Sequence, residues 1–354
     1  MKLFADLPMP KNDEVFSSWI YRCAHSNKSR RQGRHLLELG VRYVASTPDP
    51  TFEDPDFDSQ SEYFVRACNI LNIDLKIATE LFTKHAYPIV PWDQRAYFCT
   101  LCVREDIASG ALPSWRKSWC YDNSIMCGVH RTELTILEQF PTSSKAWDAF
   151  CQTAQYSFEV GRWESDKFLR LRFLCLCRIL RWLRAQQKNE PALSQAGVYL
   201  GLYSNFLKVS TIRYPPGLAR RLFYKGIVRN FRDGISFLDC MIMGPSYSPP
   251  RNRFASIALL GWLLEILTCR QMTALLNKFS DVAAYFPRDL HDVSRNVLGI
   301  GGLDHYLEFK NYLGLFFRPL GSRLDLFLAD QERACNVYFA VDQNHAFGCS
   351  PADN

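Results

Sequence analysis

Apolar residues recur at helical spacing over most of this chain, which predicts a protein built mainly from α-helices. The first such stretch runs from Asn12 to Asn27, and Asn12 or Asp13 can serve as its N-terminal cap. Its apolar positions lie along one face and are Val15, Phe16, Trp19, Ile20, Cys23 and Ala24. Pro8 and Pro10 come before this stretch, so the residues ahead of the helix are expected to be extended.

Three shorter helices are expected next, over Leu36–Val44, Glu62–Leu71 and Leu75–Thr83. The connection Ser46–Ser59 is rich in proline and acidic residues and is expected to be a loop. Solvation in that loop also explains its acids better than a metal site does, among them Asp54, Asp56 and Asp58.

Short helices joined by tight turns fit two arrangements, a helix-turn-helix whose second helix enters a DNA groove, or a plain helical bundle. The exposed positions of the last helix carry mixed charges and lack the Arg, Asn and Gln residues expected of a base reader. Both arrangements remain open at the level of sequence.

The helix expected over Lys167–Arg184 has the most distinctive pattern in the chain. Five of its cations fall within an arc of roughly 120°, namely Lys167, Arg170, Arg178, Arg181 and Arg184. Arg172 breaks the pattern and points toward the apolar side. A second basic helix is expected to begin at Pro215-Pro216, and its cations are Arg220, Arg221, Lys225, Arg229 and Arg232.

Together the two basic helices predict a surface for nucleic acid or for a partner protein. The residues assigned to it are Arg170, Arg178, Arg181, Arg184, Arg220, Arg221, Lys225 and Arg229. For either helix taken alone, a solvated face on a core helix explains the charges equally well. Further helices are expected over Phe254–Thr268, Gln271–Phe286, Asp304–Phe317 and Ser322–Val341, whereas Ala146–Glu164 is expected to be a linker.

Composition agrees with a folded cytosolic chain. Of 354 residues, 47% are hydrophobic and 22% are charged, and no uninterrupted apolar run is long enough to cross a bilayer. Asp6 and Pro8 interrupt the N-terminus before a signal-peptide core can form. The 13 cysteines are an odd number in a large chain, so most are expected to be core residues or free thiols. The formal net charge of +6 permits contact with nucleic acid without requiring it.

Four residues between Tyr97 and Leu137 stand at the spacing of a metal site. Cys99 and Cys102 form a Cys-x-x-Cys pair, and Cys127 and His130 form a Cys-x-x-His pair. Each pair is a tight knuckle, and the intervening loop can fold back to bring both to one tetrahedral Zn²⁺. Because three thiolates and an imidazole leave no coordination position for water, the zinc is expected to be structural and not catalytic.

The motif and the helical pattern together divide the chain into three parts. We expect an N-terminal helical module over residues 1–90, a zinc-binding module over residues 91–145 and a C-terminal helical domain over residues 146–354. The expected fold class is mostly α, with many helices and one small Cys3His zinc finger.

Sequence signals for catalysis are missing. The His-x-Glu knuckle of zinc-dependent base deaminases does not occur. The glycine cluster Gly299–Gly302 is not followed by Lys-Ser or Lys-Thr, so it is not a P-loop, and there is no Gly-x-Ser-x-Gly elbow. We therefore expect a protein that is not an enzyme.

The opening residues and the zinc motif resemble the TniQ/TnsD family of Tn7-like transposition proteins. The opening match is Leu7-Pro8-x-Pro10, then Asp13-Glu14, then Ser17-Ser18-Trp19-Ile20-x-Arg22-x-Ala24. The zinc match is Phe98-Cys99-x-x-Cys102, the segment from Trp115 to Trp119, and Cys127-x-x-His130 with Leu134. A looser match covers Phe279–Leu290, whereas the clear resemblance covers about residues 7 to 140.

The resemblance implies a target-selection adaptor of a bacterial Tn7-like element. Members of this family do not cut or join DNA, but connect a target-recognition event to an AAA+ regulator (TnsC-like) that brings in the transposase. Some members bind an attachment site in target DNA directly, and others sit as a homodimer on an RNA-guided Cascade complex of crRNA and Cas proteins. The resemblance also implies that Trp19 and Arg22 are scaffold residues.

This chain departs from the longer relatives in two respects. Cys151, Cys175 and Cys177 have no matching knuckle pair, so a single zinc is expected. Only residues 288–354 follow Pro287, which favours the adaptor on the guide complex over direct recognition of an attachment site. A stand-alone DNA-binding protein remains the alternative, and an enzyme is a distant third.

Overall fold

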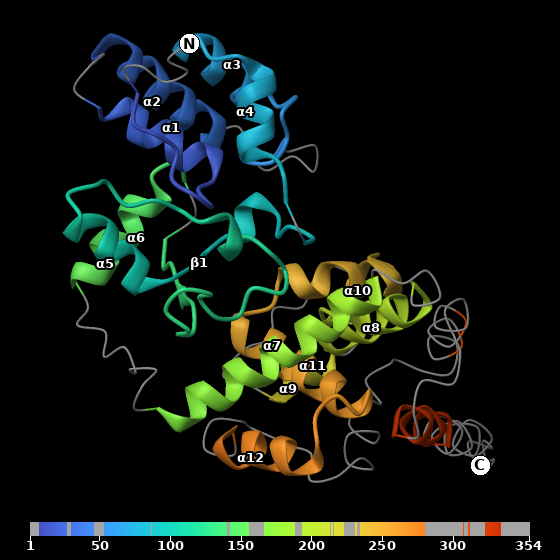
Figure 1. Cartoon of the computed structure of the whole chain (residues 1–354). Helices are drawn as coiled ribbons and strands as arrows, with labels where there is room; N and C mark the ends of the chain where they lie inside the picture. Colours follow the sequence, from blue (N-terminus) through green and yellow to red (C-terminus); the bar gives the residue numbers. More distant parts are fainter. Residues whose placement is uncertain are drawn as a thin grey trace, which may run out of the picture. The chain divides into compact units, whose positions relative to one another are not determined.

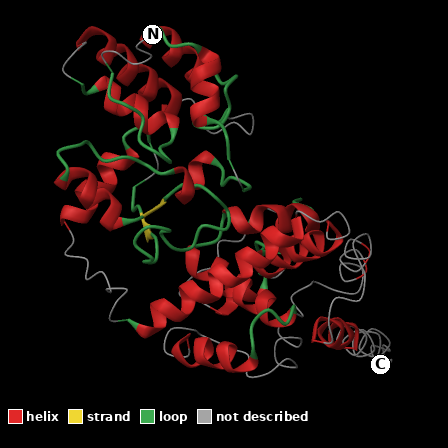
Figure 2. Ribbon diagram, viewed as in Figure 1, coloured by secondary structure: helices red, strands yellow, loops and turns green. Residues whose placement is uncertain are grey.

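A computed structural model describes most of the chain in two compact units, residues Met1–Asp166 and Lys167–Asn354 (Figure 1). The described residues are 7–26, 30–45, 53–85, 87–139, 142–155, 166–187, 193–212, 214, 216–222, 231, 234–279, 307, 311 and 323–333. Helices dominate this part of the chain (Figure 2), so the predicted mostly helical fold is confirmed. None of the described helices combines the length and the apolar character needed to cross a membrane. The expected division into three domains stays a prediction.

The first unit begins with four helices around an aromatic core. They are α1 (Phe16–Ala24), α2 (Arg30–Ala45), α3 (Glu62–Leu71) and α4 (Leu75–Phe82). The core contains the fully buried rings of Phe16, Trp19, Tyr63, Phe64 and Phe82. The Phe16 and Phe64 rings stack with their centroids 3.9 Å apart, and the Trp19 and Phe82 rings stack at 5.2 Å. Large rings of this kind contribute much of the apolar burial that holds short helices together.

Local sequence signals predict three of these helices well. α3 has the predicted limits, α4 ends one residue before Thr83, and α2 begins at Arg30, earlier than the predicted Leu36. The Ser61 hydroxyl accepts a hydrogen bond from the backbone N–H of Phe64 at 3.2 Å and caps α3. A short turn from Asn72 to Asp74 joins α3 to α4, and Asn72 takes the left-handed conformation (φ 53°) that ends many helices.

The first helix is shorter than its apolar pattern predicts. α1 starts at Phe16, and its cap residue Val15 makes no side-chain cap, so neither Asn12 nor Asp13 is the N-cap. The reason is tertiary, because the backbone of residues 13–15 pairs with a distant segment. The Val15 N–H donates to Trp115 O at 3.0 Å, and the Lys117 N–H donates to Asp13 O at 2.6 Å.

The remainder of the first unit surrounds the Cys-x-x-Cys motif. Its elements are the short helices η1 (Trp92–Gln94) and η2 (Lys117–Trp119), the strands β1 (Tyr97–Phe98) and β2 (Thr135–Ile136), and the helices α5 (Thr100–Ala108) and α6 (Lys145–Gln155). The strands pair antiparallel, with Tyr97 opposite Ile136 and Phe98 opposite Thr135.

The linker predicted over Ala146–Glu164 is wrong for its first ten residues, which belong to α6. Ala146 and Ala149 of this helix are buried in the same core as the Cys-x-x-Cys motif. Residues 156–165 lie outside the described part of the chain.

A buried charge cluster joins the loop before α3 to this region. Asp56 is fully buried and accepts hydrogen bonds from the Ser17 N–H (2.8 Å), Arg95 Nη1 (3.1 Å) and Lys145 Nζ (3.2 Å). Arg95 also pairs with Asp54. Burial by itself raises the pKa of Asp56, but the charges of Lys145 and Arg95 outweigh it and lower that pKa.

The predicted solvated loop is therefore wrong for Asp54 and Asp56. Their partners Arg95 and Lys145 lie far away in the sequence, and no local pattern marks them.

In the part of the second unit that the structure describes, six helices and one further helical segment pack together. The six are α7 (Lys167–Gln187), α8 (Leu193–Leu207), α9 (Leu218–Leu222), α10 (Phe237–Ser246), α11 (Pro250–Leu263) and α12 (Cys269–Phe279), and residues 323–333 are also helical. α8 contacts α7, α9, α10 and α11, and α11 contacts α7, α8, α9 and α12, so these two helices lie at the centre of the described part of the unit. α8 and α10 were not predicted, because their mostly apolar sequences show no clear polar face. The predicted helix Asp304–Phe317 lies outside the described residues except at positions 307 and 311.

Arginine side chains cover helix ends in this unit. Arg220 donates from Nε to Leu207 O (2.6 Å) at the end of α8, and from Nη2 to Gly244 O (3.1 Å) near the end of α10. Arg253 donates from Nε to Pro245 O at 2.9 Å. The last carbonyl groups of a helix have no partner within it, so a guanidinium supplies the missing donors and also complements the helix dipole.

One lysine of this unit is buried. Lys208, just after α8, is 1% exposed, and its Nζ lies 4.7 Å from the centroid of the Phe237 ring. Burial lowers the pKa of Lys208 to about 7 from an ordinary 10.5, while Cys240 opposes and Arg221 assists this shift.

The close approach of α1 and α2 yields a first prediction. A Cβ at Gly33 would lie 2.3 Å from the backbone oxygen of Ala24, so Gly33→Ala must push the two helices apart. We expect a loss of roughly 1–2 kcal/mol in unfolding free energy, because overpacking outweighs the better helix propensity of alanine. Urea unfolding measures this, with Gly128→Ala as the control, since a Cβ at Gly128 meets nothing within 4 Å. Equal stability of the two variants would contradict the close packing.

The buried lysine yields a second prediction. Between pH 7 and pH 10.5 the unfolded state binds more protons than the folded state at Lys208, so stability rises with pH across that window. Relative to Lys208→Met, the wild-type unfolding free energy should rise by roughly 2–3 kcal/mol from pH 7 to pH 9. Urea unfolding of both proteins at the two pH values measures the difference. If the unfolding free energies of the wild type and Lys208→Met changed equally with pH, burial of the Lys208 side chain would be contradicted.

Candidate metal centre

The first two cysteines of the motif are positioned by the start of α5. Cys99 is the N-cap residue of this helix and Cys102 lies in its first turn, directly after strand β1. Residues three apart on a helix point to the same side, so both thiols face one point. Both side chains are buried.

The second pair lies in a tight turn. The Arg131 N–H donates to Cys127 O at 2.8 Å, and the Cys127 N–H donates to Thr132 O at 2.8 Å. Arg131 takes a left-handed conformation (φ 58°), which folds the turn back on itself. The His130 N–H points to Cys127 Sγ at 3.4 Å. The turn therefore presents Cys127 and His130 to the same point as the first pair.

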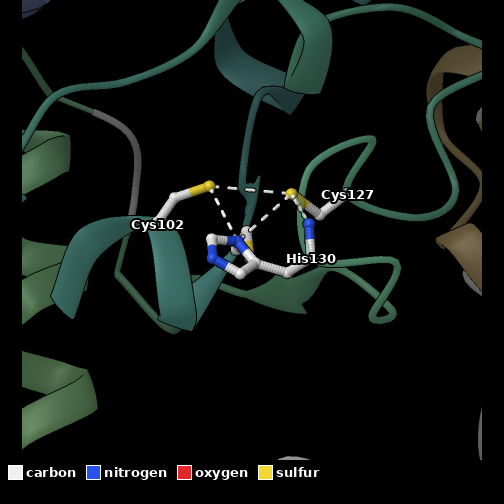
Figure 3. Close-up of side chains that lie close together, drawn as sticks. Cys102, Cys127 and His130 are labelled. Carbon is white, nitrogen blue, oxygen red and sulfur yellow. Dashed lines mark hydrogen bonds between the residues drawn. The ribbon is translucent and has the colours of Figure 1, made fainter. Parts of the chain in front are cut away.

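All four predicted residues come together, and Figure 3 shows three of them, Cys102, Cys127 and His130, pointing toward one another. Their potential ligand atoms lie within 4.8 Å of one another, and the group can hold one metal ion. His130 Nδ1 is 3.5 Å from Cys99 Sγ, 3.3 Å from Cys102 Sγ and 3.7 Å from Cys127 Sγ, and the Cys102 and Cys127 sulfurs are 3.6 Å apart. Tetrahedral Zn²⁺ with ordinary bond lengths requires about 3.6 Å between N and S and about 3.8 Å between two S atoms. The donor atoms therefore fit zinc in both type and spacing.

The ionisation of the three thiols also favours a cation at this site. Hydrogen bonding with Cys127 raises the pKa of Cys102, whereas accepting from Cys102 lowers the pKa of Cys127. Thiolates this close repel one another, so one sulfur ionises at the expense of its neighbour unless a cation lies between them. A Zn²⁺ ion bound by Cys99, Cys102, Cys127 and His130 would supply that positive charge and favour all three thiolates.

Glu105 orients the histidine. Its Oε1 lies 2.8 Å from His130 Nε2, so the proton on Nε2 is donated to the carboxylate and Nδ1 is left free to bind a metal. The motif search did not identify Glu105. A signal was available, because Glu105 follows Cys102 by three residues on α5 and therefore lies on the same side of the helix.

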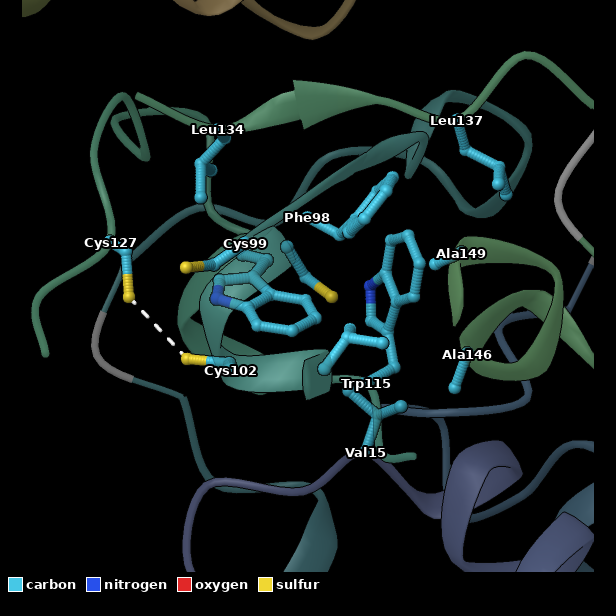
Figure 4. Close-up of a cluster of buried hydrophobic side chains, with 13 residues drawn as sticks. Val15, Phe98, Cys99, Cys102, Trp115, Cys127, Leu134, Leu137, Ala146 and Ala149 are labelled. Atoms are coloured by element: carbon cyan, nitrogen blue, oxygen red, sulfur yellow. Dashed lines mark hydrogen bonds between the residues drawn. The ribbon is translucent and has the colours of Figure 1, made fainter. Parts of the chain in front are cut away.

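The cluster is part of the hydrophobic core of this region (Figure 4). Phe98, Trp115, Trp119, Leu134 and Leu137 are buried around the cysteines. The rings of Trp115 and Trp119 meet edge to face with centroids 5.4 Å apart. With four protein ligands and this apolar surround, the site has the features of a structural metal centre.

The opening residues pack directly against the loop between the two knuckles. The Trp115 N–H donates to Ser18 Oγ at 2.9 Å, and Ser118 Oγ donates to Asp13 Oδ2 at 2.5 Å. Val15 is a member of the same buried core as the cysteines. The helix α1 and the metal centre are therefore built as one structure.

Trp19 and Arg22 hold the extended lead-in, as expected of scaffold residues. Trp19 Nε1 donates to Pro8 O at 2.7 Å, and Arg22 Nη2 donates to Met9 O at 2.6 Å. Arg22 also forms a buried ion pair with Glu14 at 3.0 Å. Both side chains are buried, and the expectation is confirmed.

The predicted basic surface divides into three groups. Arg170, Arg178, Arg181 and Arg184 are exposed on α7. Arg220 turns toward helix-end carbonyls, and Arg221 is half-buried, which lowers its pKa. Lys225 and Arg229 lie outside the described residues. Arg172 points into the core, as expected, with its guanidinium 4.6 Å from the centroid of the Phe254 ring.

The metal centre yields a third prediction. We expect about one equivalent of Zn²⁺ per chain in the wild type, and an affinity reduced roughly 10- to 100-fold in Glu105→Gln, because the histidine loses its orienting carboxylate. Cys127→Ser removes a ligand and should lower both zinc content and thermal stability. Competition with a chromophoric chelator measures affinity, and Cys151→Ser serves as control because Cys151 is an exposed cysteine outside the cluster. Equal zinc retention in Cys127→Ser and Cys151→Ser would rule out the site.

The sequence was compared with protein families and with known proteins. A sequence model of the TniQ family matches residues 7–134, a range that includes the opening helix and all four residues of the Cys3His cluster. Comparison with characterised proteins and with solved structures gives no match. The structure explains why the two motifs occur in one domain, since the opening residues and the loop between the knuckles pack against each other. Residues 7–134 therefore form a TniQ domain, the domain of a family that acts in target selection for Tn7-like transposition.

Proposed function

We propose that this chain is a non-catalytic target-selection adaptor of a bacterial Tn7-like element. In this role it links an RNA-guided Cascade-type CRISPR effector to the AAA+ regulator and, through it, to the transposase. The observation that carries the proposal is the TniQ domain over residues 7–134. The adaptor acts as a homodimer in the bacterial cytoplasm, on target DNA chosen by the guide RNA.

The metal centre supports a role in positioning partners. We propose that Cys99, Cys102, Cys127 and His130 hold one structural Zn²⁺. The bound ion would link the Cys99–Cys102 pair firmly to the Cys127–His130 pair. It would have no open coordination position for water or substrate. Glu105 orients the imidazole, and the surrounding aromatic residues pack against the buried cysteines.

A single zinc also fits the other cysteines. Cys175 and Cys177 lie on α7, whereas Cys151 is exposed on α6. Among the residues that the structure describes, the Cys3His cluster is the one group with metal-binding geometry.

The second candidate function is direct, TnsD-like recognition of an attachment site in DNA. Two features favour it. α3 and α4 form a pair of short helices joined by a tight turn, and four arginines are exposed on α7. The exposed face of α3 is less favourable, because Arg66 there is paired with Glu62 of the same helix.

Co-elution distinguishes the two functions and is the fourth prediction. Full-length protein should co-elute on size exclusion with the purified effector ribonucleoprotein from the same genetic element, and the complex should recruit the AAA+ regulator. Without guide RNA, the chain should show no preferred DNA sequence in a binding selection. The Cys127→Ser variant is the matched control for loss of the domain's fold.

Two results would count against the adaptor. One is absence of co-elution with the effector under conditions where zinc-loaded wild type is folded. The other is tight binding to one DNA sequence in the absence of guide RNA, which would establish the second candidate.

A further inference from the structure

One side of α7 carries a row of exposed cations, interrupted at its centre by an apolar residue. Lys167, Arg170, Arg178, Arg181 and Arg184 are all exposed, and they lie within roughly 120° of one another around the helix axis. Leu174 lies in the same row and is 62% exposed. From Lys167 to Arg184 the row extends for about 26 Å, at 1.5 Å per residue.

The sequence of α7 contains no Asp or Glu, and neither does the sequence of α12, which packs against it. Arg178, Arg181 and Arg184 follow one another at intervals of three residues, so their like charges repel and oppose helix formation. The acids nearest in sequence to the two helices are Asp166, just before α7, and Asp281, two residues after the last residue of α12.

The row is held in a fixed orientation by the opposite side of the helix. Cys175, Leu176, Ile179 and Leu183 are buried there. α11 approaches closely at Gly261, where an added Cβ would lie 2.5 Å from Ile179 Cδ1. Rotation of the helix would expose these apolar residues, so its packing keeps the charged side outward.

α12 extends the charged face. Arg178 Nη1 lies 3.5 Å from Gln271 Oε1, which connects the two helices at this point. The residue before Gln271, Arg270, is also exposed. The face thus gathers cations from two helices.

We propose that this α7–α12 face binds the phosphodiester backbone of nucleic acid without reading its sequence. Guanidinium groups donate paired hydrogen bonds that match phosphate oxygens. The row contains no Asn or Gln, the side chains that read adenine, and at its centre it presents an apolar Leu174. Such a face adds a nucleic-acid contact to the proposed function. This contact does not depend on whether the chain docks on an RNA-guided effector.

The test measures binding of the full-length chain to labelled nucleic acid over a range of KCl concentrations. The probes are a DNA duplex, an RNA duplex of the same length and a single-stranded RNA. Comparison of the three shows which type of nucleic acid supplies the phosphates that the face binds. For duplex DNA the slope of log K against log[salt] should fall in magnitude by about 2 in the double variant Arg178→Gln/Arg181→Gln, since each phosphate contact contributes about 0.9. Affinity at low salt should fall roughly tenfold or more.

The control variant is Arg104→Gln/Arg333→Gln, which removes two exposed arginines from other helices. It should keep the wild-type affinity and slope. The thermal midpoint of Arg178→Gln/Arg181→Gln should not fall, because the substitution removes repulsion, and this confirms that any loss of binding is not a loss of folding.

Three outcomes overturn the inference: no salt-dependent binding by the wild type, an equal loss in both double variants, or unchanged nucleic-acid binding in Arg178→Gln/Arg181→Gln. If that last variant instead loses co-elution with the protein subunits of the effector, the face binds an acidic protein. Because the probes are free nucleic acids, this result is independent of whether the chain acts as an adaptor.

Discussion

The first unit depends on the closure of one loop by the Cys3His cluster. The four residues join the start of α5 to the turn at Cys127–His130, and the loop of residues 103–126 lies between them. Closing a loop of this length costs conformational entropy, which a metal ion bound to the four residues would offset. The closed loop then offers the backbone of Trp115 and Lys117 to the opening segment. The start of α1 is therefore set by a site more than eighty positions along the chain.

Buried charges determine how the parts of the first unit fit together. Asp56 receives hydrogen bonds from the start of α1, from Arg95 and from Lys145 of α6, so one carboxylate connects three segments. Buried ion pairs contribute little net stability compared with apolar residues of the same size, but removal of one partner is costly. Such a cluster penalises any arrangement in which the partners do not meet. It specifies one packing of the metal centre against the helices.

The arginines of the second unit show how position decides the role of a single residue type. Arg220 and Arg253 lie near helix ends and donate to carbonyl groups there. Arg172 lies on the inner side of α7 and packs on Phe254. Arg178 and Arg181, on the outer side of the same helix, remain exposed. The charge of the chain as a whole says little about binding, whereas the arrangement on α7 concentrates it on one face.

Local spacing in the sequence determined the two pairs of residues that meet in the Cys3His cluster, the limits of α3, and the division of α7 into a buried and a charged side, because each depends on residues a few positions apart. The helices α8 and α10 were not predictable in this way, since an apolar sequence without a polar face shows no helical period. Only the tertiary structure decided the late start of α1, the burial of Asp56 and the turning of Arg220 to helix ends. In each of these the partner lies outside the residue's own helix or loop. Such a partner becomes available only when the chain has folded, so no local pattern in the sequence records it.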